Sequence, residues 1–184
     1  ERRNGLGLEG WKALAEACGG EGLEAIAPGL SGLVGRTLAD LGRRWPSDLP
    51  RSVIHADLFP DNVLMLGDRV SALIDFYFAC TDITAYDIAI THAAWCFDAD
   101  GRRFDPAISR ELLAGYEAIR PISAAERAAL PILAQGAAMR FLMSRAYDWM
   151  NTPSDAMVTR KDPMAFARRL EFYADSVNAM VFER

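Results

Sequence analysis

Three short apolar stretches lie close together in the first half of the chain, at residues 53–54, 63–66 and 70–74. The second and third are separated by Gly67-Asp68-Arg69. Short runs rich in Val, Ile and Leu around a Gly/Asp turn are typical of a β-hairpin. The pattern therefore predicts a small hairpin, preceded by a loop that begins at His55.

On the N-terminal side of the hairpin, apolar residues recur at the spacing of an α-helix. One helix is predicted over residues 9–18, and Gly19-Gly20 ends it. A second helical pattern covers residues 23–45, and Pro28-Gly29 either weakens this helix or splits it in two. We therefore expect residues 1–50 to form a helical entry to the hairpin.

The C-terminal half is also helical in its apolar spacing, after an irregular segment at residues 76–81. Ser123 followed by Glu126 is the signature of a capping box, so a long helix should start there. Pro163 suits the first turn of a final helix. One small hairpin among many helices predicts an α+β fold. The predicted helices of this half span residues 83–97, 108–118, 123–150 and 164–182.

Polar side chains gather at the open end of the predicted hairpin. A turn centred on residues 68–69 places Asn62 opposite Asp75, with Asp57 at the same end. A turn centred on residues 67–68 shifts the pairing by two. In either register, Asp57, Asn62 and Asp75 should lie at one site.

These three side chains suit the transfer of a phosphoryl group from ATP. The reaction needs a carboxylate near the attacking hydroxyl and oxygen ligands that hold Mg²⁺ against the phosphates. Asp57 is the candidate base, and Asn62 and Asp75 are the candidate Mg²⁺ ligands. The alternative is an ordinary hairpin whose loop acids are merely solvated.

The composition is that of a globular protein and argues against some partners. The chain has 184 residues, of which 51% are hydrophobic and 24% charged, which fits one domain with a substantial core. The net charge of −5, without a basic run, makes nucleic acid an unexpected partner. No apolar run approaches the roughly 18–20 residues that span a membrane. Three widely spaced cysteines suit a reducing cytoplasm better than a disulfide framework.

Two motifs carry a resemblance to a known group of enzymes. The first is His55-Ala-Asp57, with Asn62 five residues after the aspartate, and the second is Ile74-Asp75-Phe76. Together they resemble the phosphotransferase superfamily of aminoglycoside and choline kinases, which has a protein-kinase-like fold. The runs Asp-Phe-Tyr-Phe-Ala-Cys at 75–80 and Ala-Trp-Cys-Phe at 94–97 are similar to homoserine kinases of that superfamily.

The resemblance implies a reaction and its cofactors. A homoserine kinase uses ATP and Mg²⁺ to phosphorylate the hydroxyl of L-homoserine, giving O-phospho-L-homoserine for threonine biosynthesis. By this resemblance Asp57 orients or deprotonates the hydroxyl, and Asn62 and Asp75 hold the metal on the nucleotide. Asp87 should brace the catalytic loop, although an exposed acid at a helix N-terminus is the alternative. His55 is expected to order the same loop. One departure is Ala93, where the family pattern has Asn.

Homoserine also carries a carboxylate and an ammonium, and the predicted helix at 123–150 offers partners for both. Arg140 and Tyr147 fall on one face with Ser144, and Arg145 and Asp148 fall on another. An arginine suits the carboxylate and Asp148 suits the ammonium. The alternative is a structural Arg–Asp pair. Trp95 either lines the substrate pocket or packs in the core.

The chain offers few candidates for the nucleotide-binding parts of a kinase. It has two lysines, Lys12 and Lys161, and neither is placed like the phosphate-binding lysine of a kinase N-terminal lobe. We therefore expect residues 1–184 to be the C-terminal lobe of a kinase whose N-terminal ATP lobe is absent from this chain. Its expected parts are a helical lead-in at 1–50, a catalytic core at 51–90 and a helical substrate subdomain at 91–184.

Two other functions remain open from the sequence. One is a kinase for a different small alcohol, such as choline, an aminoglycoside or a sugar. The other is a lobe that binds a nucleotide or a partner without catalysis. The sequence does not indicate an oligomeric state.

Overall fold

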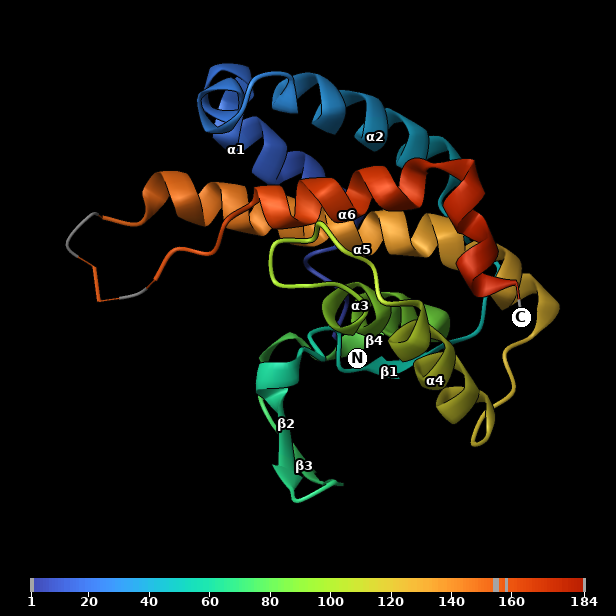
Figure 1. Cartoon of the computed structure of the whole chain (residues 1–184). Coiled ribbons are helices and arrows are strands. Elements are labelled where there is room, and N and C mark those ends of the chain that lie inside the picture. The colour runs from blue at the N-terminus through green and yellow to red at the C-terminus, as the bar shows by residue number, and fades with distance from the viewer. Residues whose placement is uncertain (1, 154–155, 158, 184) are drawn as a thin grey trace.

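One long helix, α5 (Ala124–Asn151), runs through the centre of the molecule, and most of the other helices pack against it (Figure 1). The computed structural model describes residues 2–153, 156–157 and 159–183. Helices dominate, and the described strands form two two-stranded sheets, so the predicted α+β class is confirmed. The predicted capping box is also confirmed, because Ser123 and Glu126 cap the start of α5 reciprocally. Pro131 lies inside this helix without ending it.

The first two helices cover one side of α5 (Figure 1). Helix α1 (Leu8–Ile26) has a kink at Gly19, whose φ of +67° favours glycine, so the predicted interruption is present but the helix resumes beyond it. Helix α2 (Leu30–Arg44) starts after Gly29, which confirms the split at Pro28-Gly29. Gly136 of α5 lies directly under Trp45, since a Cβ at this position would meet the indole ring at 2.2 Å.

The predicted hairpin consists of β2 (Val63–Leu66) and β3 (Arg69–Leu73), and it extends away from the helices (Figure 1). Its turn is at residues 67–68, the second of the two predicted registers. An irregularity between Leu64 and Met65 then shifts the pairing by one residue. As a result the amide of Ile74 donates to the carbonyl of Asn62 at 3.0 Å, and Asn62 is opposite Ile74 rather than Asp75.

A second sheet was not predicted. Strand β1 (Arg51–Ile54) pairs antiparallel with β4 (Cys80–Ile83), so the expectation of an irregular segment through residue 81 was wrong at its end. The segment before β4 is a single 3₁₀ turn, η2 (Phe76–Phe78). This pairing connects the strand before the loop of Asp57 to the start of α3 (Thr84–Trp95).

The C-terminal elements complete the helical layer. The predicted final helix ends earlier than expected, because the Asp175 carboxylate accepts from the amide of Val177 and starts a 3₁₀ segment there. His92 is fully buried, and its ring nitrogens bond to Tyr173 and Ser109. Burial lowers the pKa of His92 to about 3, which fits a neutral structural histidine.

No helix in the described part of the chain has the length and apolar character to cross a membrane. The remaining elements are η1 (Pro60–Asn62), α4 (Pro106–Glu117), α6 (Met164–Ala174) and η3 (Ser176–Phe182).

Candidate active site

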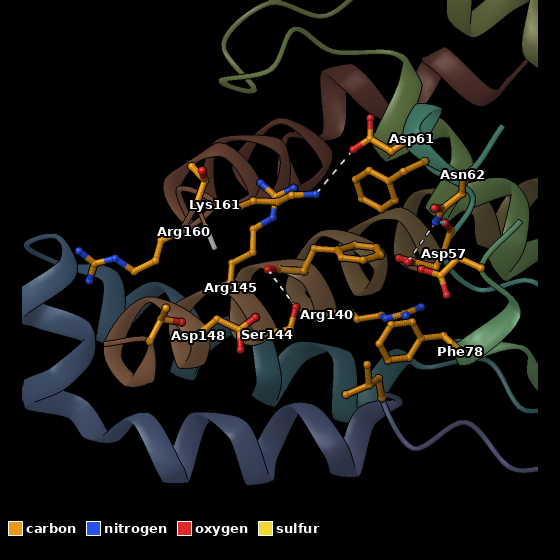
Figure 2. Close-up of a pocket in the computed structure, with 16 residues that line it drawn as sticks. Asp57, Asp61, Asn62, Phe78, Arg140, Ser144, Arg145, Asp148, Arg160 and Lys161 are labelled. Atoms are coloured by element: carbon orange, nitrogen blue, oxygen red, sulfur yellow. Dashed lines mark hydrogen bonds and ion pairs between the residues drawn. The ribbon is translucent and has the colours of Figure 1, made fainter. Parts of the chain in front are cut away.

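A cavity of about 560 Å³ lies between the loop after β1, the base of the hairpin and the C-terminal half of α5. Asp57, Asn62 and Asp75 all line it, so the structure brings together the three groups that the sequence predicted at one site. Figure 2 shows Asp57 and Asn62 at one end of the cavity, with Ser144 and Asp148 of α5 toward the other. The cavity therefore joins the predicted catalytic groups to part of the predicted substrate helix.

The loop that carries Asp57 is held in a strained conformation. Ala56 has a φ of +63°, a left-handed value that is costly for a residue with a side chain, and it is fully buried. The Asp87 carboxylate accepts hydrogen bonds from the backbone amides of His55 at 2.9 Å and Ala56 at 2.8 Å. The guanidinium of Arg140 donates to the carbonyl of Ala56. These contacts fix the backbone immediately before Asp57.

His55 connects the same loop to the hairpin. Its Nδ1 accepts from the amide of Asp57 at 3.2 Å, so the proton resides on Nε2, which donates to the carbonyl of Ile74 at 2.9 Å. The centroid of the His55 ring lies 4.7 Å from the centroid of the Phe76 ring. His55 thus ties Asp57 to the residue before Asp75, and both ring nitrogens are used in doing so.

The environment of Asp57 makes it a better proton acceptor than an ordinary aspartate. Burial raises the pKa of Asp57, and the positive charge of Arg140 opposes this effect. The negative charge of Asp75 raises the pKa further, whereas a hydrogen bond from Asn62 lowers it. A half-buried carboxylate with a raised pKa accepts a proton more readily from a hydroxyl beside it.

Asn62 and Asp75 provide the donor atoms that Mg²⁺ prefers. The amide nitrogen of Asn62 donates to the backbone carbonyl of Asp57 at 2.7 Å, so the side-chain oxygen is the atom available to a metal. Asp75 is exposed, and its φ of +60° places it at the sharp turn into η2. The described residues contain no cluster of three or more His, Cys, Asp or Glu side chains arranged for a metal. Two protein oxygens suit Mg²⁺ that is also bound by phosphates and water.

The predicted substrate arginines occupy different environments. Arg140 is 1% exposed, bonds to the carbonyl of Ala56 and lies over the rings of Phe78 and Phe141. Arg145 is only partly buried and lines the cavity. The predicted alternative of an Arg–Asp pair within α5 is absent among the described residues, where neither arginine forms an ion pair with a carboxylate.

Two other predicted substrate residues do not line the cavity. Trp95 donates its indole N–H to the carbonyl of Leu58 at 2.9 Å, and so it contacts the loop of Asp57 from the α3 side. Tyr147 is 38% exposed and lies outside the set of cavity-lining residues. The structure therefore brings Arg140, Arg145 and Asp148 to the cavity but not Tyr147 or Trp95.

Several lining residues were not predicted from the sequence. Residues 159–161, shortly before α6, line the cavity, and Lys161 lies 3.8 Å from the carboxylate of Asp61 in η1 (Figure 2). Arg160 lies over the ring of Trp149 and donates to its carbonyl. No local pattern shows that Arg160 and Lys161 lie beside the cavity, although Lys161 is conspicuous as one of two lysines. Other unpredicted lining residues include Leu6, Phe59, Phe78, Phe141, Thr152 and Thr159.

Comparison with known proteins agrees with this geometry. Three curated relatives are each named "Homoserine kinase". The protein from Gluconacetobacter diazotrophicus is 56% identical over 180 residues, which are 97% of this chain and 56% of that protein. The one from Acidiphilium cryptum is 54% identical over 97% of this chain and 55% of that protein. The one from Gluconobacter oxydans is 53% identical over 94% of this chain and 54% of that protein.

The chain thus spans about half the length of the curated relatives that it matches. Residues 2–122 match the family described as "Phosphotransferase enzyme family", and this match covers well over half of the chain. It includes the loop of Asp57, the whole hairpin and Asp87. The chain belongs to the phosphotransferase enzyme family.

Proposed function

We propose that this chain provides the acceptor and catalytic site of an ATP-dependent kinase that phosphorylates the hydroxyl of L-homoserine. The product is O-phospho-L-homoserine, and the setting is threonine biosynthesis in the cytoplasm. The observation that carries the proposal is the convergence of Asp57, Asn62 and Asp75 on one cavity, in a chain whose relatives at 50–56% identity are named homoserine kinases. Residues 1–50, 51–90 and 91–184 serve as lead-in, catalytic core and substrate subdomain.

Asp57 acts on the acceptor hydroxyl in this proposal. Its carboxylate lines the cavity, and its raised pKa favours a hydrogen bond that draws the proton from the hydroxyl as the oxygen attacks. Orientation contributes as much as basicity, because phosphoryl transfer depends mainly on positioning and charge stabilisation. Asp87, His55 and Arg140 are positioning residues, since they hold the backbone on which Asp57 stands.

Asn62 and Asp75 are the residues that would hold Mg²⁺. When bound, the metal neutralises charge on the phosphates of ATP. The Asn62 side chain presents its oxygen because its nitrogen is committed to the carbonyl of Asp57. The same hydrogen bond joins Asn62 to the loop of Asp57, so the metal ligand and the base are held in position relative to each other.

The proposal is tested by ADP release from the complete gene product with Mg-ATP and a panel of acceptors. The panel contains L-homoserine, choline and an aminoglycoside. We expect turnover with homoserine but not with choline or the aminoglycoside, and we expect this turnover to be lost in Asp57→Asn. As a control, Asp40→Asn changes a partly exposed aspartate of α2, outside the cavity, and should retain activity. Turnover with choline or the aminoglycoside in place of homoserine would overturn the homoserine assignment, and nucleotide binding without turnover would favour a non-catalytic lobe.

A further inference from the structure

Arg145 and Asp148 project from the cavity side of α5, three residues apart and therefore on one helical face (Figure 2). Ser144 lines the same side of the cavity. The two charges are of opposite sign and reach a cavity that also contains Asp57. A neighbouring positive and negative group on one wall matches the paired carboxylate and ammonium of a free amino acid.

The surroundings of Arg145 favour an anion from outside the chain. Its guanidinium lies over the ring of Phe166 at 4.5 Å, and its one direct hydrogen bond to the described residues is a long one of 3.4 Å to the carbonyl of Asp162. Burial, followed by the nearby charge of Arg169, lowers the pKa of Arg145 to about 10, so the group is still charged at neutral pH. A partly desolvated charge without a counter-ion is costly, and a bound carboxylate would remove that cost.

The surroundings of Asp148 favour a cation from outside the chain. It is exposed at the cavity wall, and no basic side chain of the described residues lies within ion-pair distance of it. Asp57 lies close enough to Arg145 for its charge to raise the pKa of that guanidinium. An acceptor held at Arg145 and Asp148 is therefore within electrostatic range of the candidate base.

Arg140 is unsuited to the same task, although its charge also reaches Asp57. It is buried between two rings and committed to the carbonyl of the strained Ala56. Withdrawing it to bind a substrate would release the loop that carries Asp57. Both arginines of α5 line the cavity, but Arg140 supports the loop, whereas Arg145 is the more exposed of the two.

Resting on the proposed function, we propose that Arg145 binds the α-carboxylate of the amino acid acceptor and that Asp148 binds its α-ammonium. The hydroxyl then extends along the cavity toward Asp57. This assigns the recognition of an amino acid, as opposed to a simple alcohol, to two residues of one helix.

The test uses acceptors that each lack one of the two charged groups. 3-Amino-1-propanol is homoserine without its carboxylate, and 4-hydroxybutyrate is homoserine without its ammonium. In Arg145→Met we expect kcat/KM to fall about 10- to 100-fold for homoserine and 4-hydroxybutyrate, and to change less than about threefold for 3-amino-1-propanol. Asp148→Asn should show the opposite selectivity, with losses for homoserine and 3-amino-1-propanol but not for 4-hydroxybutyrate.

Two further variants separate recognition from folding. Arg145→Lys keeps the charge and should recover part of the lost kcat/KM, and Arg110→Met removes an exposed arginine of α4 and should change nothing. Arg145→Met should melt at or above the temperature of the wild type without ligand, because it removes a desolvated charge. Equal losses with all three acceptors, or a loss confined to the KM for ATP, would overturn the assignment.

Calorimetric binding of homoserine distinguishes this inference from the proposed function. If homoserine binding weakens in Arg145→Met but the wild type shows no turnover, the kinase activity is refuted and the recognition site is supported. Homoserine turnover with no selectivity among the acceptors in the variants would refute the recognition site alone. The absence of both binding and turnover would refute the two together.

Discussion

Replacing Asp87 with asparagine should damage both stability and catalysis, because one carboxylate holds the loop before Asp57 through two backbone amides. Asparagine keeps one acceptor oxygen, but its NH₂ group would face the second amide. The variant therefore loses one charge-assisted hydrogen bond, worth about 1.5–3 kcal/mol. At roughly 2–4 °C per kcal/mol for a domain of this size, the melting temperature should fall by about 3–12 °C.

The catalytic effect follows from the position of the base. Ala56 relaxes from its left-handed φ of +63° when one of its restraints is lost, and Asp57 moves with it. Displacing a catalytic group by about 1 Å costs on the order of 100-fold in rate, so we expect a loss of that size in kcat. The KM for homoserine should change little, since Asp87 does not line the cavity.

The assay compares thermal melts and steady-state kinetics of wild type, Asp87→Asn and Asp40→Asn. Asp40 forms exposed ion pairs with Arg43 and Arg44 on α2, so its substitution should cost less than about 1 kcal/mol and leave kcat unchanged. A wild-type kcat in Asp87→Asn would refute the reasoning about the loop. A fall in melting temperature alone would show that Asp87 stabilises α3 without positioning Asp57.

Three further variants test other parts of the account. Asp57→Asn should have a higher melting temperature than wild type at pH 7, because burial raises the pKa of Asp57 and its ionised form opposes folding above that pKa. This difference in melting temperature should disappear toward about pH 4, where the wild-type carboxyl becomes protonated. Gly136→Ala should cost about 1–3 kcal/mol by denaturant unfolding, since the new Cβ meets Trp45 at 2.2 Å. Glu126→Ala should lower the free energy of unfolding by about 2–4 kcal/mol, because it removes the helix cap and leaves Arg120 without its partner at 2.6 Å. An unchanged unfolding midpoint would contradict the role of the capping box.

The sequence was most informative where function depends on local spacing. Asp57, Asn62 and Asp75 are joined by one loop and one hairpin, so any register of a short turn brings them to the same end. The register itself was predicted only as a pair of alternatives. The irregularity between Leu64 and Met65, which sets Asn62 opposite Ile74, has no signature in the residue types.

The features that were missed depend on contacts distant in sequence. Strand β4 pairs with β1, some 30 residues earlier, and its residues Cys80–Ile83 lack a clear alternation of polar and apolar side chains. Helical spacing placed Arg140 and Arg145 on faces of α5 but could not show that both line the cavity or that Arg140 also donates to the carbonyl of Ala56. The left-handed backbone of Ala56 was also unforeseen, because alanine rarely adopts it.

The most direct test of the central claim is to identify the phosphorylated product. The complete gene product is incubated with Mg-ATP and L-homoserine, and the reaction is followed by ³¹P NMR and mass spectrometry, beside Asp57→Asn as the control. We expect phosphate on the side-chain oxygen of homoserine with the wild type and none with Asp57→Asn. Phosphohomoserine formed equally by both proteins, or ATP consumed without a phosphorylated amino acid, would contradict the account.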